Sequence, residues 1–576
     1  MEILRYHFLQ PILEALALFG LITVSLLRRK SADRKRPTAF FRWFLLARRR
    51  PWIAFLLVGL LAFSASALLT VFAGIPQPCV HDEFSYLLAA DTFAHGRLAN
   101  PTHPLWKHFE TFHVIQHPTY ASKYPPAQGI TLALGQVIFG HPIIGVWLSV
   151  GLACAAICWM LAGWCSLPWA WIGGLVALVG LVFSRPWNVL NLGLGYAYWS
   201  QSYWGGAVAA LGGALVFGAL PRIMKKTRLR DALWLALGLA ILANSRAFEG
   251  LVVSIPVAVV LIIWIFRNKC LSYRDKFYRL VLPVVLVLLI TASWMSFYNF
   301  RVTGNPFLMP YHLHESSYAI ASQFICKPLR PEPQYNHKTM YDFYRQERNY
   351  YSQLRTIKGW VYSSIKKIVK FCFFYFGIIF SPFIIYMTVS RTVSRQWNVM
   401  FPLGICALMM AALLAVTWSL PHYAAPVACL VFLLVVESLR QARRLIWRGK
   451  PIGKRLVRGV LPMYLVSAIL SFPVAHHLQQ KQPLVAWSMD RARILWELEQ
   501  DNERHLVIVR YDSNHDAGNE WVYNKADIDG AKVVWARDMG PESNKDLLDY
   551  FKGRHVWLLE PSKLHRKFKA YPMVSP

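Results

Sequence analysis

The sequence predicts an all-α polytopic membrane protein, a helical bundle of about twelve spans, with a small extramembrane α/β domain at its C-terminal end. First, 55% of the 576 residues are apolar and 16% are charged, whereas an average soluble protein has about 25% charged residues. Second, the apolar residues gather in blocks of about 17–24, the length that crosses a bilayer. Third, residues 477–576 hold 15 basic and 15 acidic residues, whereas the first 476 residues hold 47 basic and 15 acidic.

Residues 8–27 are expected to form the first membrane helix. Ten basic residues follow it between Arg28 and Arg50. A cleaved signal peptide carries its charge before the apolar core, so this order favours a helix that ends in the cytoplasm. The other predicted spans are 52–73, 142–164, 168–184, 203–221, 231–247, 250–266, 279–297, 369–388, 398–418, 421–437 and 459–475.

The basic excess lies in short loops between these blocks, which is the positive-inside pattern rather than a nucleic-acid-binding surface. Alternating the orientation of the spans puts every basic cluster in the cytoplasm: 222–230, 267–279, 389–397 and 438–458. The same alternation places two long loops, 74–125 and 298–368, outside. We therefore expect the polar chemistry at the outer surface.

The chain is expected to divide into an N-terminal helix with a basic segment (1–51), a transmembrane domain (52–476) and an external α/β domain (477–576). Within the last domain, alternating and β-branched runs predict strands, and two stretches predict helices. These elements are a helix at 485–500, strands at His505–Arg510, Lys532–Trp535 and His555–Leu559, and a helix at 543–552.

His81, Asp82 and Glu83 follow the second span closely. A carboxylate just above the membrane can act as a general base, and the three side chains together are the candidate donors for a divalent metal ion, if one is used. The alternative is a helix N-terminus, where acidic residues favour the dipole. The loop also holds six histidines whose spacing fits no standard metal motif, and we favour polar loop roles for them: His81, His95, His103, His108, His113 and His117.

Four cationic or titratable residues are candidates to bind an anion at the outer surface. Lys123 precedes Tyr124 and a Pro-Pro pair, and it either meets a phosphate or anchors the chain at the interface. Arg246 lies in a short external turn, where it either pairs with Glu249 or binds an anion. Arg301 opens the second long loop, and His422 begins a later span.

Trp199, Tyr203 and Trp204 lie in the predicted external stretch 185–204. Aromatic rings stack on sugars, but they also form belts at membrane interfaces. Since the chain has 23 Trp and 26 Tyr residues, the belt is the favoured interpretation. Cys79 and Cys326, one in each long loop, are a candidate disulfide because oxidising compartments permit one.

Five sequence elements, taken in order, resemble the GT-C superfamily of membrane glycosyltransferases over about residues 50–440. The nearest relatives are the protein O-mannosyltransferase-like and lipid A aminoarabinose transferase-like enzymes. The family's acidic pair matches Asp82-Glu83, and its Lys-Pro-Pro element matches Lys123–Pro126 with Tyr124 inserted. Later elements match Arg246–Gly250, Asn299–Pro306 and His422–Pro426, where His replaces Arg.

The resemblance implies a glycosyltransferase of the bacterial inner membrane that moves a sugar from a polyprenyl-phosphate donor to an acceptor hydroxyl on the outer face. Asp82 would act as general base with inversion, and Glu83 would support it or a divalent ion. The donor phosphate would be bound by Lys123, Arg246, Arg301 and His422. Sugar or acceptor contacts would come from Tyr124, Trp199, Tyr203 and Trp204. The acceptor is a glycan, a lipid or a protein.

Two other functions fit the same sequence features. A transporter or flippase for lipid-linked saccharides would share the lateral lipid entry and the cationic outer residues, but it would not need Asp82. A scaffold that presents its tail to an envelope partner would need no catalytic group at all. Assay of sugar transfer from a lipid-linked donor separates the enzyme from both.

Overall fold

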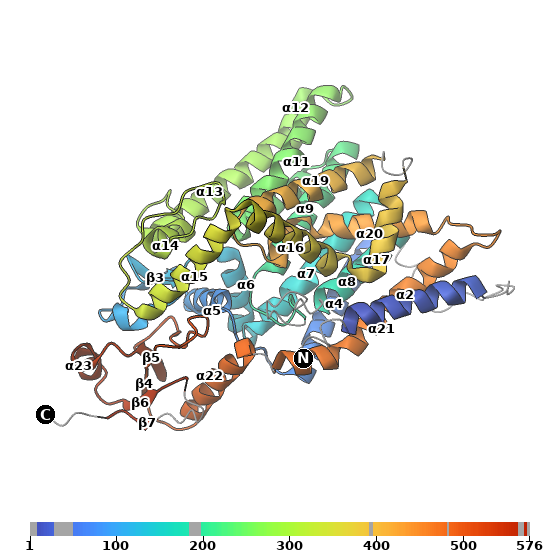
Figure 1. Cartoon of the computed structure of the whole chain (residues 1–576). Coiled ribbons are helices and arrows are strands. Elements are labelled where there is room, and N and C mark those ends of the chain that lie inside the picture. The colour runs from blue at the N-terminus through green and yellow to red at the C-terminus, as the bar shows by residue number, and fades with distance from the viewer. Residues whose placement is uncertain are drawn as a thin grey trace. The chain divides into compact units, whose positions relative to one another are not determined.

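The computed structural model describes residues 9–27, 50–183, 197–390, 396–480, 483–562 and 569–572, and Figure 1 traces them. The chain forms two compact units, each built from three segments. The helical unit contains Met1–Ile75, Val146–Ala292 and Val361–Gln479. The loop-tail unit contains Pro76–Gly145, Ser293–Trp360 and Gln480–Pro576.

Helices make up the first unit, and each of the twelve predicted spans overlaps at least one of them. Their bounds are α2 (Leu9–Leu27), α4 (Pro51–Ala73), α7 (Ile143–Trp164), α8 (Leu167–Val182), α9 (Gly206–Lys225), α10 (Leu229–Ser245), α11 (Ala247–Arg267), α12 (Tyr273–Lys276), the π-helical η3 (Phe277–Val281), α13 (Leu282–Thr303), α16 (Ile357–Tyr375), α17 (Gly377–Val389), α19 (Trp397–Ala415), the 3-10 helix η4 (Pro421–Val427), α20 (Ala428–Ala442) and α21 (Ile452–Gln480).

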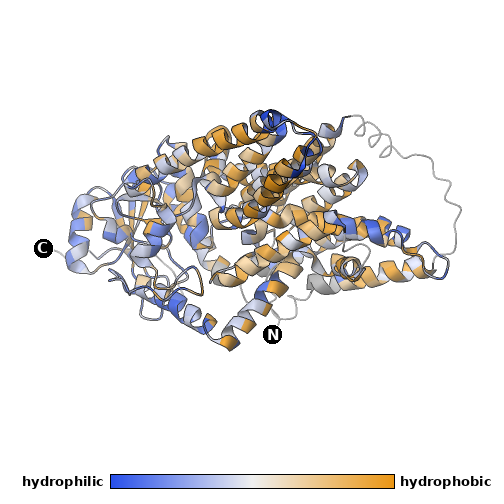
Figure 2. Ribbon diagram, turned by 90° about the horizontal axis from the view of Figure 1, so that it is seen from above, coloured by the Kyte–Doolittle hydropathy of each residue, from blue (hydrophilic) through white to orange (hydrophobic). Residues whose placement is uncertain are grey.

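Among the described residues, eight helices are long and apolar enough to cross a membrane, or nine if the bent pair α16 and α17 is one span. The chain therefore has the helices of a multi-pass membrane protein, and the count of twelve spans stays a prediction. Figure 2 shows how apolar these long helices are. Their outward side chains, such as Val71 and Phe72 of α4, with exposed fractions of 78% and 72%, suit lipid rather than water.

The interior of the helical unit is packed closely around α9 and α20. Every residue of α20 except Arg440 is buried. In α9, a Cβ atom at Gly213 would lie 2.0 Å from the carbonyl oxygen of Pro426 in η4. Only glycine permits this approach of two backbones, as small residues do in other membrane bundles.

The prediction of one continuous span at 369–388 is wrong. Helices α16 and α17 meet at an angle of 102°, and Gly377 at the junction has φ +59°, which a right-handed helix cannot accommodate. The Glu14 carboxylate of α2 accepts the Ile378 N–H at 3.0 Å, within the first turn of α17. This contact satisfies a backbone donor that the break leaves without a helical partner.

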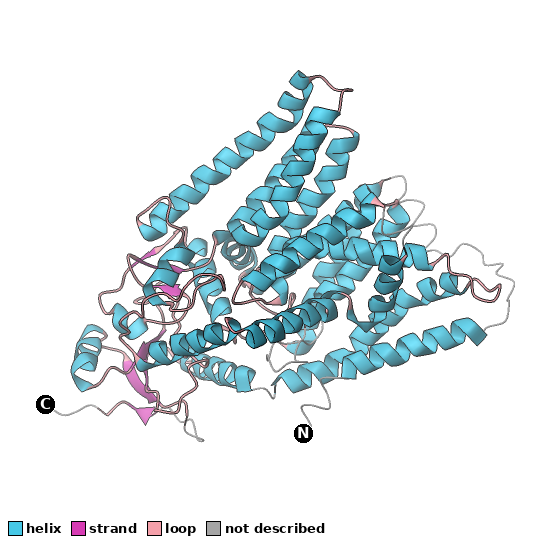
Figure 3. Cartoon of the chain, turned by 45° about the horizontal axis from the view of Figure 1, so that its top comes forward, coloured by secondary structure: helices cyan, strands magenta, loops and turns pink. Residues whose placement is uncertain are grey.

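The loop-tail unit contains short helices and two small sheets, whose strands are magenta in Figure 3. The first long loop contributes α5 (His81–Ala94), β1 (Asn100–Pro101), η1 (Trp106–Phe109), β2 (Val114–Ile115) and β3 (Thr119–Ser122), and α6 (Pro126–Phe139) follows it. The second long loop contributes α14 (Pro310–Tyr318) and α15 (Lys338–Leu354). The tail contributes α22 (Pro483–Glu499), β4 (His505–Val509), β5 (Val533–Arg537), α23 (Pro541–Tyr550), β6 (His555–Leu559) and β7 (Lys569–Ala570).

The tail sheet has the order β5-β4-β6-β7. Strands β5 and β6 both pair with β4 in parallel, and β7 is antiparallel to β6. All the predicted helices and strands of the tail are present. The two long loops also contain secondary structure, with helices in both and short strands in the first.

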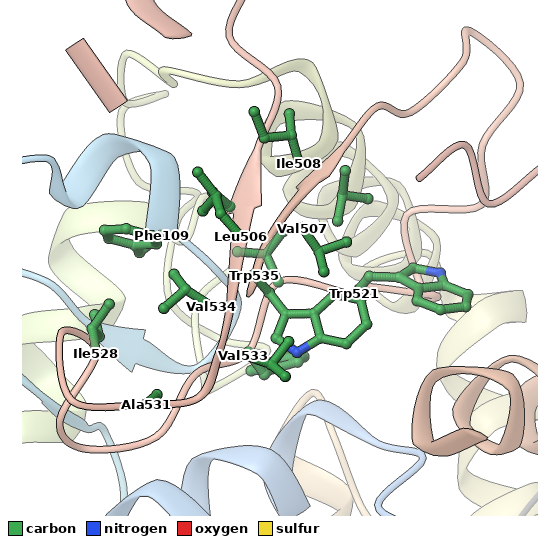
Figure 4. Packing of buried hydrophobic residues seen from close by; sticks show 14 of the residues in the cluster. Phe109, Leu506, Val507, Ile508, Trp521, Ile528, Ala531, Val533, Val534 and Trp535 are labelled. Atoms are coloured by element: carbon green, nitrogen blue, oxygen red, sulfur yellow. The ribbon is translucent and has the colours of Figure 1, made fainter. Parts of the chain in front are cut away.

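Residues 477–576 do not form a compact unit by themselves in this structure. The apolar core of the tail includes Trp521, Trp535 and the buried strand β4, as Figure 4 shows. The same core also contains Phe84 and Phe109 from the first long loop. Since these rings are buried against the tail, the loops and the tail fold as one unit.

The predicted disulfide between Cys79 and Cys326 is absent, and all nine cysteines are free thiols. Cys326 is exposed and Cys79 is half-buried. The backbone N–H of Cys79 donates a hydrogen bond to the Glu83 carboxylate.

Candidate functional site

Glu83 lies at the start of α5 and caps it. Its Oε2 atom accepts the N–H of Cys79 at 3.0 Å and that of Val80 at 3.3 Å. The side chain is 2% exposed. Glu83 therefore makes the contacts expected at a helix N-terminus.

Asp82, the neighbour of Glu83 at the start of α5, is hydrogen-bonded by residues of the loop that follows this helix. Its Oδ1 atom lies 2.8 Å from Nδ1 of His113, and the Tyr124 hydroxyl also bonds to this carboxylate. Burial opposes ionisation, but His113, Lys123 and Tyr124 outweigh it and hold the pKa of Asp82 well below its ordinary value. Burial and Lys123 lower the pKa of His113. A neutral His113 with its proton on Nδ1 therefore donates to an ionised Asp82.

Lys123 is part of the same buried cluster rather than a side chain at a lipid interface. Its Nζ atom lies 3.3 Å from Oε1 of Glu315, and it is 5% exposed. Glu315 also lies 3.3 Å from Nη1 of Arg330 through its Oε2 atom. Burial raises the pKa of Glu315, but Lys123, His314 and Arg330 outweigh it and lower that pKa. Glu315 is therefore ionised and shared between two cations.

Glu347 of α15 is the acid of this cluster that is hardest to ionise. Burial, and then the charges of Glu315 and Asp82, raise its pKa to about 8, although Lys123 opposes the shift. The neighbouring acids are thus in different states near neutral pH, with Asp82 and Glu315 ionised and Glu347 mostly protonated. Such a separation of pKa values is common at functional sites.

The tail supplies one residue to this cluster. The Tyr523 hydroxyl lies 2.8 Å from Nδ1 of His81, and its ring stacks on Phe84 with 4.1 Å between centroids. The buried Arg491 donates to the Tyr523 carbonyl at 2.7 Å and so fixes the backbone there. Burial, and then the neighbouring His113, lower the pKa of His81 to about 3, so this ring is neutral.

The side chains predicted to hold a metal ion do not converge. His81 bonds to Tyr523, Asp82 to His113, and Glu83 to backbone N–H groups of its own helix. Across the described part of the chain, no three His, Cys, Asp or Glu side chains are grouped as metal donors. The residues present therefore do not fit a divalent ion, and no catalytic step is assigned to one.

A second group of predicted residues comes together in the helical unit. The Arg246 guanidinium, between α10 and α11, lies 4.1 Å from the centroid of the Tyr423 ring. The adjacent His422 is fully buried, with its ring stacked on Trp204 at 5.3 Å. The Tyr198 hydroxyl forms a short hydrogen bond with Nδ1 of His422.

The belt interpretation of the neighbouring aromatic residues is wrong. Trp199, Tyr203 and Trp204 are 2%, 2% and 5% exposed, whereas residues of an interfacial belt face lipid and headgroups. Trp204 instead packs on His422, and Trp199 stacks on Phe374 of α16. These rings line the interior of the helical unit.

Comparison with known proteins gives a match of fold. No protein-family model and no curated protein sequence matches the chain. The crystal structure of apo ArnT from Cupriavidus metallidurans has a TM-score of 0.50 and 14% identity, over 91% of this chain and 93% of ArnT. The chain therefore shares its fold with ArnT.

Two further crystal structures are similar to the chain. ArnT bound to undecaprenyl phosphate has a TM-score of 0.48 and 14% identity, over 87% of this chain and 92% of ArnT. The oligosaccharyltransferase of Archaeoglobus fulgidus, in complex with Zn and sulfate, has a TM-score of 0.45 and 10% identity, over 87% and 67% of the two chains.

Apart from Glu83, which caps α5, the predicted residues fall into two groups and one outlier. Asp82, Lys123 and Tyr124 share the cluster of the loop-tail unit, and Arg246, His422 and the three aromatic residues lie in the helical unit. Arg301 belongs to neither group: it is exposed at the end of α13, with its guanidinium 6.0 Å from the Phe297 ring centroid.

Sequence reasoning missed most partners of Asp82 and Lys123. His113 was assigned only a polar loop role. No recognisable motif marks Glu315, Arg330, Glu347 or Tyr523, and each lies far along the chain from Asp82. Only the acidic residues of the second long loop offered a signal, since charged residues in a loop between apolar blocks can be functional.

Proposed function

We propose that the chain is a glycosyltransferase that moves a sugar from a polyprenyl-phosphate donor to an acceptor hydroxyl. The observation that carries the proposal is the ionised Asp82, buried and oriented by His113 and Tyr124 beside Lys123. The shared GT-C fold supports the choice of reaction class. ArnT, which has this fold, has been crystallised with undecaprenyl phosphate, and a donor of that kind needs no nucleotide site.

In this mechanism the acceptor hydroxyl attacks the anomeric carbon, and Asp82 takes its proton. The low pKa of Asp82 makes it a weak base. A weak base is sufficient if the proton leaves late, because the attacking oxygen becomes strongly acidic as its bond to carbon forms. His113 and Tyr124 hold the carboxylate in one orientation, which limits the entropy lost in reaching the transition state. A single displacement inverts the anomeric centre.

The leaving group is a phosphate monoester, which needs positive charge as its bond to the sugar breaks. Lys123 is our candidate in the loop-tail unit. Its ammonium group has three N–H donors. It pairs with one oxygen of Glu315, and Arg330 pairs with the other. An N–H of Lys123 therefore remains for a phosphate oxygen. Arg246, Arg301 and His422 stay candidates for the phosphate, and Tyr124, Trp199, Tyr203 and Trp204 for the sugar or acceptor. The reaction would take place on the outer face of a bacterial inner membrane, with the tail on that side.

The deciding experiment follows release of polyprenyl phosphate by the purified chain from a panel of undecaprenyl-phosphate sugars, with a cell-envelope glycan extract as acceptor. Asp82→Asn should lower the rate about 10²–10⁴-fold, the usual contribution of a general base. Asp546→Asn, at an exposed acid of α23, is the matched control and should keep the rate. Wild-type turnover by Asp82→Asn removes the general-base assignment. Donor movement across vesicles without bond cleavage would indicate a flippase instead.

A further inference from the structure

A cavity of about 330 Å³ lies within the loop-tail unit, and the proposed mechanism does not use it. This volume is at the lower end of the range for small-molecule sites. Its walls come from the start of α15 and from the segments that follow β4 and β5. The residues that the argument uses are His337, Lys338, Asp342, Tyr511, Asp512 and Arg537.

The most buried residues of the cavity wall are basic or titratable, namely Arg537 and His337, at 3% and 8% exposure. Nη2 of Arg537 donates to Glu520 at 2.6 Å and to the Glu110 carbonyl at 3.0 Å. Its Nε and Nη1 atoms form no hydrogen bond with any described residue. Buried guanidinium N–H groups are rarely left without a partner, so the wall at Arg537 is rich in donors and short of hydrogen-bond acceptors.

The first turn of α15 adds donors to the same wall. This 17-residue helix begins after His337, and no side chain caps its N-terminal N–H groups. Lys338 and Thr339, at its first two positions, both line the cavity. Uncapped helix N-termini attract anions. The carboxyl ends of the parallel strands β4 and β5, which meet here, are a common place for ligands.

The outer wall of the cavity is mixed in charge. Asp342 and Asp512 lie there with Lys338 and Arg510, and Asp512 and Lys338 are exposed. The Tyr511 ring stacks on His515 with 4.1 Å between centroids. Carboxylates accept hydrogen bonds from hydroxyl groups, whereas a bare anion would be repelled by these acids.

We propose that this cavity binds a sugar ring that carries a carboxylate or a phosphate. The acidic group lies toward Arg537 and the start of α15, and the hydroxyls bond to the outer carboxylates. The proposal does not depend on transferase activity. Its test measures binding alone and can succeed where the proposed function fails.

The experiment is calorimetric titration of the purified full-length protein in detergent with glucuronate, glucose 6-phosphate, glucose and inorganic phosphate. Glucuronate or glucose 6-phosphate should bind more tightly than glucose and than phosphate. Lys338→Ala should weaken that binding about fivefold, the effect of one exposed charge-assisted contact. Thr339→Trp should abolish it by filling the cavity. Lys545→Ala, at an exposed lysine of α23 that does not line the cavity, should leave it unchanged.

Three outcomes would overturn the proposal. They are no binding by either acidic sugar, equal binding of glucose or phosphate, and unchanged binding in both Lys338→Ala and Thr339→Trp. Since Arg537 is buried in an ion pair with Glu520, Arg537→Lys is the second variant. Its unfolding temperature is measured first, and a folded Arg537→Lys that binds like wild type also contradicts the proposal.

Discussion

The Nδ1 atom of His113 lies 2.8 Å from the Asp82 carboxylate, and His113 reaches it from a backbone with φ +60°. Residues other than glycine rarely adopt this left-handed conformation, although histidine does so more often than most. His113 is therefore held in an unfavourable backbone geometry at the position where it orients the proposed base. Such strain is common at functional sites.

Replacing His113 tests whether it keeps Asp82 ionised. Asn tolerates the same φ, so His113→Asn removes the imidazole with little backbone cost. The pKa of Asp82 should rise, and the acid limb of the pH–rate profile should move to higher pH, with a rate loss of about 10²-fold from poorer orientation. His95→Asn, at the exposed end of α5, is the control. An unmoved acid limb would show that His113 does not act on Asp82.

Lys123 should matter for stability as well as for donor binding. Lys123→Met leaves Glu315 buried with only Arg330 as its cationic partner, and we expect a loss of about 3 kcal/mol in unfolding free energy. The double variant Lys123→Met/Glu315→Gln should recover part of that loss, because the unpaired charge is gone. Denaturant titration in detergent measures both. A double variant less stable than the single one would contradict this pairing.

His81 should make the protein sensitive to acid. In the unfolded chain this ring gains a proton below pH 6.5, whereas in the folded protein it stays neutral down to about 3. The unfolded state therefore binds more protons between these values, and stability falls as pH falls, by up to about 1.4 kcal/mol per pH unit. Melting temperatures from pH 7 to pH 4 should fall less steeply in His81→Asn than in wild type. The slope of His95→Asn should match wild type.

Glu347 should have the opposite dependence. Its folded pKa of about 8 is above the ordinary 4.5, so the folded state holds a proton that the unfolded state releases, and stability is lost as pH rises toward 8. Glu347→Gln mimics the protonated acid and should be more stable than wild type at pH 8, by more than about 1 kcal/mol. At pH 4 the two should be similar. Equal melting temperatures of Glu347→Gln and wild type at pH 8 would mean that Glu347 is ionised in the folded protein at that pH.

Two native cysteines test the proposed topology. Cys326 and Cys270 are both exposed, one in the second long loop and one in a predicted cytoplasmic loop. A membrane-impermeant maleimide should label intact cells through Cys326 only. Cys326→Ala should abolish that labelling and Cys270→Ala should not. The reverse pattern would put the proposed reaction on the cytoplasmic side.

The helices were predictable because apolar blocks of sufficient length have few alternatives in a membrane. Residues 369–388 show the limit, since hydropathy cannot distinguish a straight span from two helices that bend at Gly377. The strands of the tail were equally clear from their β-branched runs. The packing of the tail against Phe84 and Phe109 was not predictable from the sequence, because packing between distant segments leaves no periodic signal.

The site was predictable only in part. Asp82 and Lys123 stood out by residue type and position, and the structure puts them in one cluster. Glu83 shared the same signal but caps α5, because adjacent residues of a helix point in different directions. Glu315, Glu347 and Tyr523 reach the cluster through tertiary packing, which one sequence does not encode visibly.

The loop-tail unit is assembled from three stretches of chain separated by long runs of membrane helices. During synthesis, Phe84 and Phe109 emerge early, but the strands that bury them are made only after residue 504. The first long loop must therefore wait, with apolar rings uncovered, until the membrane helices and the strands beyond residue 504 have been translated. A premature stop codon between residues 481 and 504 would spare every long apolar helix and still leave the Asp82 region without its supporting core.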